Sequence, residues 1–121
     1  MSTVVDLEMD RGDDRTWEFT VEVDGVATDI TGASFRFMAK THYSDADVDA
    51  IVTATTAGGE CVITDAANGV MEVSLSPADT SSLTETARLY YDLQMTEAGG
   101  GVRTITRGLL TVNADVSITV P

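Results

Sequence analysis

The sequence is short of the residues that cross-link small domains or build metal centres. Its 121 residues include one cysteine, one histidine and two prolines. A single Cys61 excludes an internal disulfide and a zinc site made from several cysteines, and we expect it to be a small buried hydrophobe. No cysteine or serine nucleophile is arranged around His42, so we expect a surface residue. We therefore predict no catalytic, cofactor-binding or metal-binding residues and no enzyme activity.

Long apolar runs and positive charge are also scarce. No run of about 18 apolar residues occurs, so a membrane-spanning helix is excluded. Residues 1–6 have neither the basic region nor the apolar segment of a secretory signal, so we expect a protein that stays in the cytoplasm or leaves by cell lysis. The net charge of −13 repels nucleic-acid phosphates and anionic membranes. The acidity suits docking against a basic partner, or simply solubility.

What the sequence does contain is alternation of apolar and polar residues with a period of two, clearest in residues 17–23, 89–95 and 102–112. Such a period places one face of a strand toward a core and the other toward water. Further runs of this kind are residues 5–9, 33–39, 61–64, 70–75 and 116–120. Seven to nine short strands are expected, which predicts an antiparallel sandwich or barrel in a single domain, residues 1–121. A two-layer sandwich is favoured because aromatic residues are few.

Turn-forming residues separate these strands. Asp24-Gly25 and Asn68-Gly69 supply the positive φ angles of tight reversals. Gly108 interrupts the alternation of residues 102–112, which predicts a β-bulge at that glycine.

One short helical turn is expected near residues 77–83. Ser76 can cap it, Pro77 suits its first position, and Asp79 favours the positive end of a helix. Leu83 would then pack the turn onto the core.

Residues 41–59 are the least regular part, and we expect an exposed loop leading to a short edge strand at residues 51–55. Three aspartates alternate within it: Asp45, Asp47 and Asp49. An EF-hand calcium loop would need a glycine and a bidentate carboxylate where this chain has Ala50 and Thr56, so an EF-type site is rejected. A solvated acidic loop is the default expectation, and a looser calcium site is the alternative.

Two short patterns have a structural and a functional interpretation. Residues 11–13 spell the Arg-Gly-Asp adhesion tripeptide, but such matches arise by chance and Gly12 suits a turn. Tyr43 and Tyr90 are expected to face outward, whereas Trp17 and Tyr91 are expected to face the core. Exposed tyrosines serve partner surfaces, although isolated ones are also ordinary.

The order of short motifs resembles a known family. In sequence order the motifs are Arg11-Gly12-Asp13-Asp14, residues 17–23, Asp24-Gly25, Asp29-Ile30-Thr31-Gly32-Ala33, Phe35-x-Phe37, Pro77-Ala78-Asp79-Thr80 with Leu83, Tyr90-Tyr91-Asp92-Leu93-Gln94, Gly101-Val102-x-Thr104, Gly108-x-Leu110-x-Val112 and Asp115-Val116. They resemble the immunoglobulin-like N-terminal domain of baseplate upper proteins and related small virion proteins of tailed bacteriophages. The resemblance covers nearly the whole chain. It implies an immunoglobulin-like β-sandwich used for assembly, with no catalytic residues.

We therefore expect a virion structural protein, assembled in the host cytoplasm, that docks on other virion proteins and forms a homo-oligomer in the particle. In baseplate upper proteins a longer region follows such a domain, so tail, neck, baseplate and capsid decoration all stay open. Contacts are expected from residues 1–10, 41–59 and 96–101, which contribute least to the inferred core. The alternative is a carbohydrate- or calcium-binding β-sandwich adhesion module.

Overall fold

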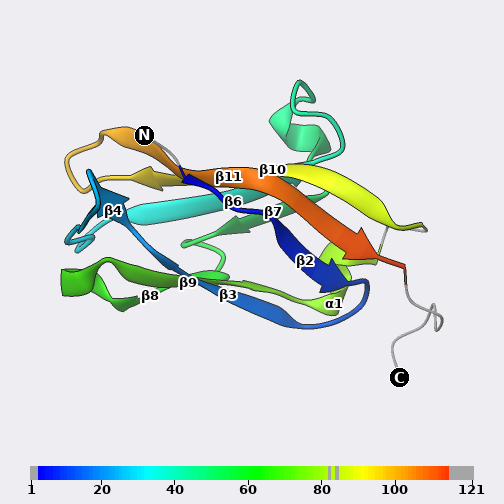
Figure 1. Ribbon diagram of the computed structural model, residues 1–121, viewed down its shortest axis with the longest axis horizontal. Helices are drawn as coiled ribbons and strands as arrows, with labels where there is room; N and C mark the ends of the chain where they lie inside the picture. Colours follow the sequence, from blue (N-terminus) through cyan, green and yellow to red (C-terminus); the bar gives the residue numbers. More distant parts are fainter. Residues whose placement is uncertain (1–2, 82, 84, 115–121) are drawn as a thin grey trace.

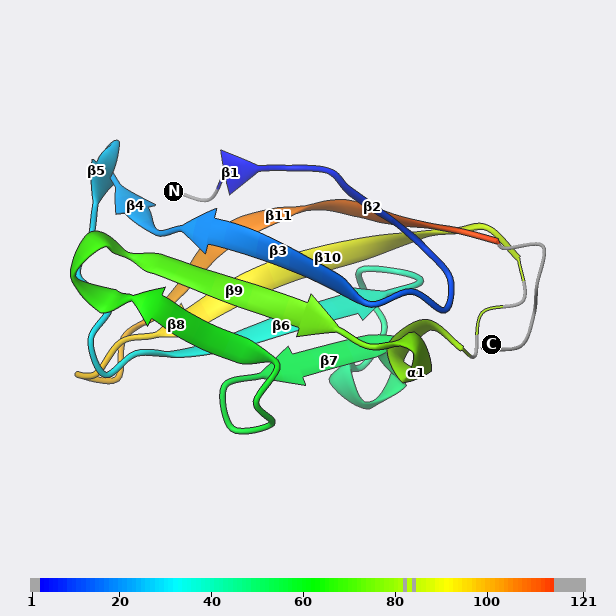
Figure 2. The ribbon, with the colours of Figure 1, turned by 90° about the horizontal axis from the view of Figure 1, so that it is seen from below.

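Two β-sheets packed face to face make up the fold in the computed structural model, which describes residues 3–81, 83 and 85–114 (Figures 1 and 2). The larger sheet has the strand order β1-β11-β10-β6-β7, with β2 also paired to β11, and the smaller sheet has the order β3-β9-β8. Strands β4 and β5 form a separate hairpin. The expected all-β sandwich is thereby confirmed. The strands are β1 (Thr3–Val4), β2 (Leu7–Asp10), β3 (Arg15–Thr20), β4 (Glu22–Val23), β5 (Val26–Ala27), β6 (Ser34–Lys40), β7 (Val52–Thr55), β8 (Cys61–Asp65), β9 (Val70–Leu75), β10 (Ala87–Thr96) and β11 (Val102–Asn113).

The core lies between the two sheets and is built from the inward residues of the alternating strands. Phe37 on β6 is fully buried and stacks between two aromatic rings, with ring-centroid distances of 6.0 Å to Trp17 and 5.1 Å to Tyr91. These contacts confirm the inward positions expected for Trp17 and Tyr91. Cys61 is also buried, as expected, and its burial raises the pKa of the thiol to about 11.

The predicted reversals are present at the expected residues. Asp24 and Gly25 have φ angles of 53° and 80° and join β4 to β5. The turn between β8 and β9 contains the 3₁₀ segment η2 (Ala66–Asn68) and ends at Gly69, whose φ is 74°. A Cβ atom on Gly69 would lie 2.5 Å from the Thr28 carbonyl oxygen, so only glycine fits there.

A single helical turn, α1 (Pro77–Thr80), follows β9 as predicted. The Asp79 carboxylate accepts a hydrogen bond from the Ser76 backbone N–H at 2.7 Å, which holds the start of the turn. Leu83 packs against the core, also as predicted.

The Arg-Gly-Asp tripeptide forms the turn after β2. The guanidinium of Arg11 donates to the carbonyl oxygens of Leu83 and Ser81, at 2.6 and 2.9 Å. The Gly12 N–H donates to the buried hydroxyl of Thr80. The prediction of a turn at Gly12 is therefore confirmed, and the tripeptide links the N-terminal strand to the segment after α1 by hydrogen bonds.

The N-terminal strand departs from the expected antiparallel pairing. Both β1 and β2 run parallel to β11, with Thr3 opposite Thr106 and Leu7 opposite Leu110. The strand is interrupted at Val5, whose carbonyl oxygen accepts a short hydrogen bond from the Tyr91 hydroxyl. Alternation shows which face a strand buries but not the direction of its partner, so the sequence did not indicate this.

The prediction of a bulge at Gly108 was wrong. The register shift lies between the pairs Leu93–Thr106 and Gln94–Thr104, so Ile105 is the extra residue. From Thr106 onward the inward positions keep one parity through Gly108 to Val112. Gly108 is a glycine for another reason, since a Cβ atom there would lie 2.3 Å from the Val5 carbonyl oxygen. The strand expected at residues 116–120 lies outside the described residues.

Candidate binding surface

The outward face of the larger sheet carries a hollow of about 820 Å³, called the outer pocket below. Its floor is formed by outward residues of β6, β10 and β11, and the segment 41–50 folds over its β6 side. Met38 occupies an outward position of β6 and lines the hollow, yet it is only 7% exposed. The lining residues are Val4, Asp6, Arg36, Met38, Lys40, Tyr43, Asp47, Tyr90, Tyr91, Asp92, Gln94, Arg107, Gly108 and Leu109.

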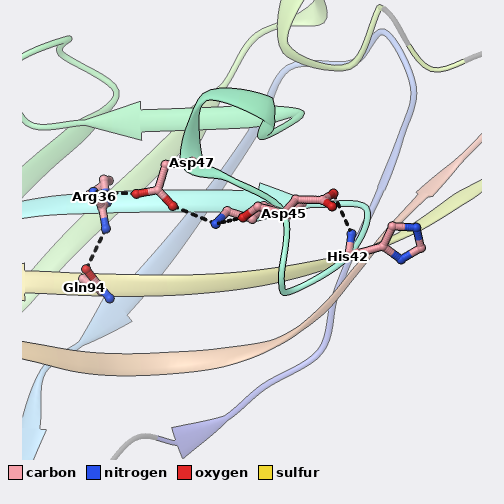
Figure 3. A network of polar contacts seen from close by, with 6 residues as sticks. Arg36, His42, Asp45, Asp47 and Gln94 are labelled. Carbon is pink, nitrogen blue, oxygen red and sulfur yellow. Dashed lines mark hydrogen bonds and ion pairs between the residues drawn. The ribbon is translucent and has the colours of Figure 1, made fainter.

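Asp47 ties the covering segment to the sheet. Its carboxylate lies 2.7 Å from Lys40 Nζ and 3.7 Å from a guanidinium nitrogen of Arg36, and Arg36 also donates to Gln94 on β10 at 2.8 Å (Figure 3). The hydrogen bond and charge of Lys40 hold the pKa of Asp47 below its usual value. This carboxylate belongs to the 3₁₀ segment η1 (Asp47–Asp49), so the network closes the loop over the pocket.

The aspartates of this loop do not converge on one point. The Asp45 carboxylate accepts the His42 backbone N–H at 3.1 Å, and its backbone carbonyl accepts from Lys40. Asp47 faces β6 instead, and the His42 ring points away from the network, as Figure 3 shows. Among residues 3–81, 83 and 85–114, no three carboxylate, histidine or cysteine side chains are grouped so as to hold a metal ion. His42 is exposed, as expected.

Two polar groups on the pocket floor are buried without enough polar contacts to replace the water they lose. Burial raises the pKa of Asp92, against the opposing attraction of Arg36 and Lys40. Arg36 Nε is buried and has no hydrogen-bond partner within the described part of the chain. A partner that supplies polar atoms here would compensate groups that the fold desolvates.

Two tyrosines stand at the rim of the pocket. Tyr43 is 80% exposed and Tyr90 is 46% exposed, and their rings meet edge to face with centroids 5.8 Å apart. Their predicted outward orientation is confirmed. The exposed Val4 of β1 also lines the pocket.

Of the three contact segments predicted from the sequence, the structure brings two together. Residues of 1–10 and of 41–59 line the outer pocket, whereas none of its described lining residues belongs to 96–101. The floor residues were missed, although Arg36, Met38 and Lys40 carry long side chains at successive outward positions of one strand. That pattern was the available signal.

No family model and no curated protein matches the sequence. Among solved structures, the fold is similar to the N-terminal domain of phage TP901-1 ORF48, with a TM-score of 0.46 and 12% identity over 95% of this chain and 89% of that chain. It is also similar to murine CRIg, with a TM-score of 0.38 and 10% identity over 91% and 92% of the two chains. Within the described residues, no helix is long and apolar enough to cross a membrane. The likenesses concern the β-sandwich alone, and no family membership follows from them.

Proposed function

We propose that this chain is a structural protein of a tailed-phage virion, an assembly module that docks on other virion proteins through the outward face of its larger sheet. The observation that carries the proposal is the outer pocket with its exposed tyrosine rim. The motif order set out above supports the phage assignment. The proposal includes no enzyme activity, and it leaves the place in the particle open.

The composition of this face suits protein docking. Tyrosine, methionine and arginine are enriched at the centres of protein interfaces, and all three line the outer pocket. Tyr43 and Tyr90 already contact each other, so their rings are partly ordered before a partner arrives. A preordered aromatic pair loses less side-chain entropy on docking than two free side chains would.

Purified particles of the phage that encodes this chain provide the test. We expect mass spectrometry to find the chain in the virion, and cross-links to its neighbours to involve residues near Tyr43 and Tyr90. The double variant Tyr43→Ser/Tyr90→Ser should be incorporated at least about tenfold less, as expected for the loss of central aromatic contacts. The matched control is Val26→Ser/Val62→Ser, which removes two exposed apolar side chains away from the pocket. Absence of the chain from virions would refute the proposal. If both double variants were incorporated into virions equally poorly, the outer pocket would not be the docking site.

The alternative, a carbohydrate-binding module, draws on the same observation, since an aromatic rim over a polar hollow also suits a sugar. Thermal unfolding with a panel of glycans, with and without calcium, separates the two. We expect no shift in Tm. A glycan-dependent rise in Tm that is lost in Tyr43→Ser/Tyr90→Ser would favour the sugar site over protein docking.

A further inference from the structure

Basic residues are concentrated on one face of an otherwise acidic chain. Four of the seven basic residues occupy outward positions on three neighbouring strands: Arg36 and Lys40 on β6, Arg88 on β10 and Arg107 on β11. Asp92 is the one carboxylate at the outward positions of these strands.

The two outward cations of β6 form ion pairs, but the outward cations of β10 and β11 do not. Arg36 and Lys40 both form ion pairs with Asp47. Arg88 and Arg107 are exposed, and neither guanidinium group has a hydrogen bond or ion pair within the described part of the chain. Tyr90 lies between them along the sheet. We call the outward side of β10 and β11 around these three residues the cationic face.

The opposite side of the sandwich has the opposite character. The outward positions of the smaller sheet carry no cation, and Glu18 on β3 lies directly opposite Glu72 on β9. Directly opposed side chains on one sheet face have Cβ atoms roughly 5 Å apart, and like charges at that separation destabilise the pair. No described cation lies within ion-pair distance of either carboxylate. We call this surface the acidic face.

We propose that copies of this chain associate head to tail, with the cationic face of one copy docked on the acidic face of the next. The partner that binds the cationic face is thus a second copy of the chain, because its acidic face has the complementary charge. Guanidinium groups of Arg88 and Arg107 would supply the counter-charge that Glu18 and Glu72 lack, in the strong charge-assisted geometry that arginine and carboxylates adopt. The two faces lie on opposite sides of the sandwich (Figure 2), so the contact is heterologous and builds a ring or an open row.

The net charge of −13 opposes this association at long range but not at contact. At physiological ionic strength the Debye length is about 8 Å, so the distant charges of two copies are largely screened from each other. Arginine and glutamate side chains in direct contact lie well within that length. Association should therefore be strongest near physiological salt and should weaken toward about 1 M salt, where the Debye length is about 3 Å.

This inference deepens the proposed role as an assembly module, and its test does not depend on virion membership. The full chain is studied by analytical ultracentrifugation as a function of concentration. We expect concentration-dependent association of the wild type, and at least about tenfold weaker association for Arg88→Glu/Arg107→Glu and for Glu18→Lys/Glu72→Lys, since like charges would then face each other. An equimolar mixture of the two variants should associate again, because each still carries the face that the other needs.

The controls reverse charges elsewhere. Arg103→Glu, in the β10–β11 hairpin, and Glu22→Lys, on β4, should leave association unchanged, and circular dichroism should show native folds for all variants. A wild type that stays monomeric overturns the inference, as does association of either double variant alone, which would indicate a symmetric contact. Tyr90 and Arg107 belong to both the cationic face and the outer pocket, so a second copy and another virion protein would compete for this side of the sheet. Membership of the virion is tested separately, by the presence of the chain in particles.

Discussion

Replacing Gly108 by alanine should loosen the N-terminal strand from the larger sheet. The new Cβ atom would lie 2.3 Å from the Val5 carbonyl oxygen and 2.9 Å from a carboxylate oxygen of Asp6. Both contacts are closer than real Cβ atoms allow, and one involves backbone. The segment between β1 and β2 must therefore move away from β11.

The cost can be worked from the contacts at this crossing. Moving Val5 breaks the hydrogen bond from the Tyr91 hydroxyl, and moving Asp6 breaks the one from the Leu109 N–H at 3.1 Å. Each is worth about 1 kcal/mol, and the overpacking adds about 1–3 kcal/mol, so we expect a loss of about 3–5 kcal/mol. At about 4 °C per kcal/mol for a domain of this size, Tm falls by about 12–20 °C.

Urea unfolding followed by circular dichroism measures the loss, and limited proteolysis reports whether residues 3–10 detach. The matched control is Gly99→Ala at the tip of the β10–β11 hairpin, where a Cβ atom meets nothing within 4 Å. We expect that control to change stability by less than about 0.5 kcal/mol. If Gly108→Ala behaves like the control, the close crossing at Val5 is refuted.

Three further outcomes are expected. Phe37→Ala should lower the free energy of unfolding by about 3–5 kcal/mol, because Phe37 is fully buried between Trp17 and Tyr91; a loss below about 1 kcal/mol in urea unfolding would contradict the stacked core. Burial raises the pKa of Asp92 in the folded state. At pH values above that pKa the buried carboxylate is ionised and lowers the free energy of unfolding, and this loss disappears as the pH falls through the pKa. Asp92→Asn should therefore raise Tm at pH 7, with a gain that shrinks on acidification; a lower Tm at pH 7 would speak against the burial argument. Cys61, whose pKa is raised to about 11, should resist alkylation at pH 8 until the chain unfolds, and rapid labelling of the folded protein would show that the thiol is accessible.

The parts of the fold that follow from local pattern were predictable. Period two and the Asp24-Gly25 turn were enough to place an extended run at residues 17–23 and the reversal after it, because hairpin geometry depends on neighbouring residues. The single strand expected there is divided at Val21 into β3 and β4, which belong to different sheets. The parallel pairing of β1 and β2 was not predictable, since it joins the two ends of the described chain. Gly108 shows the same limit. A glycine in a strand signals either a bulge or a close backbone approach, and only the fold shows that Val5 passes there.

Only some residues of the candidate site could be predicted from the sequence. The outward positions of Tyr43 and Tyr90 followed from alternation and from the polar loop. The network that closes the loop over the sheet joins Arg36 to Gln94, which are 58 positions apart, and such pairs depend on strand order. The raised pKa of Asp92 depends on the burial of its side chain in the folded protein, which the spacing of residues in the sequence does not reveal.

The pairing of Thr3 with Thr106 has a consequence for the order in which the chain acquires structure. Among the described strands β1 is synthesised first and its partner β11 last, so β1 cannot pair until nearly all of the described residues have been made. Contacts between such distant positions are slow to form, because a long loop must close before they stabilise anything. Until then, Met9 of β2, which is buried in the folded protein, has no β11 to pair with. Synthesis in a crowded cell would thus favour rapid completion of these strands or a chaperone that shields β2 until β11 has formed.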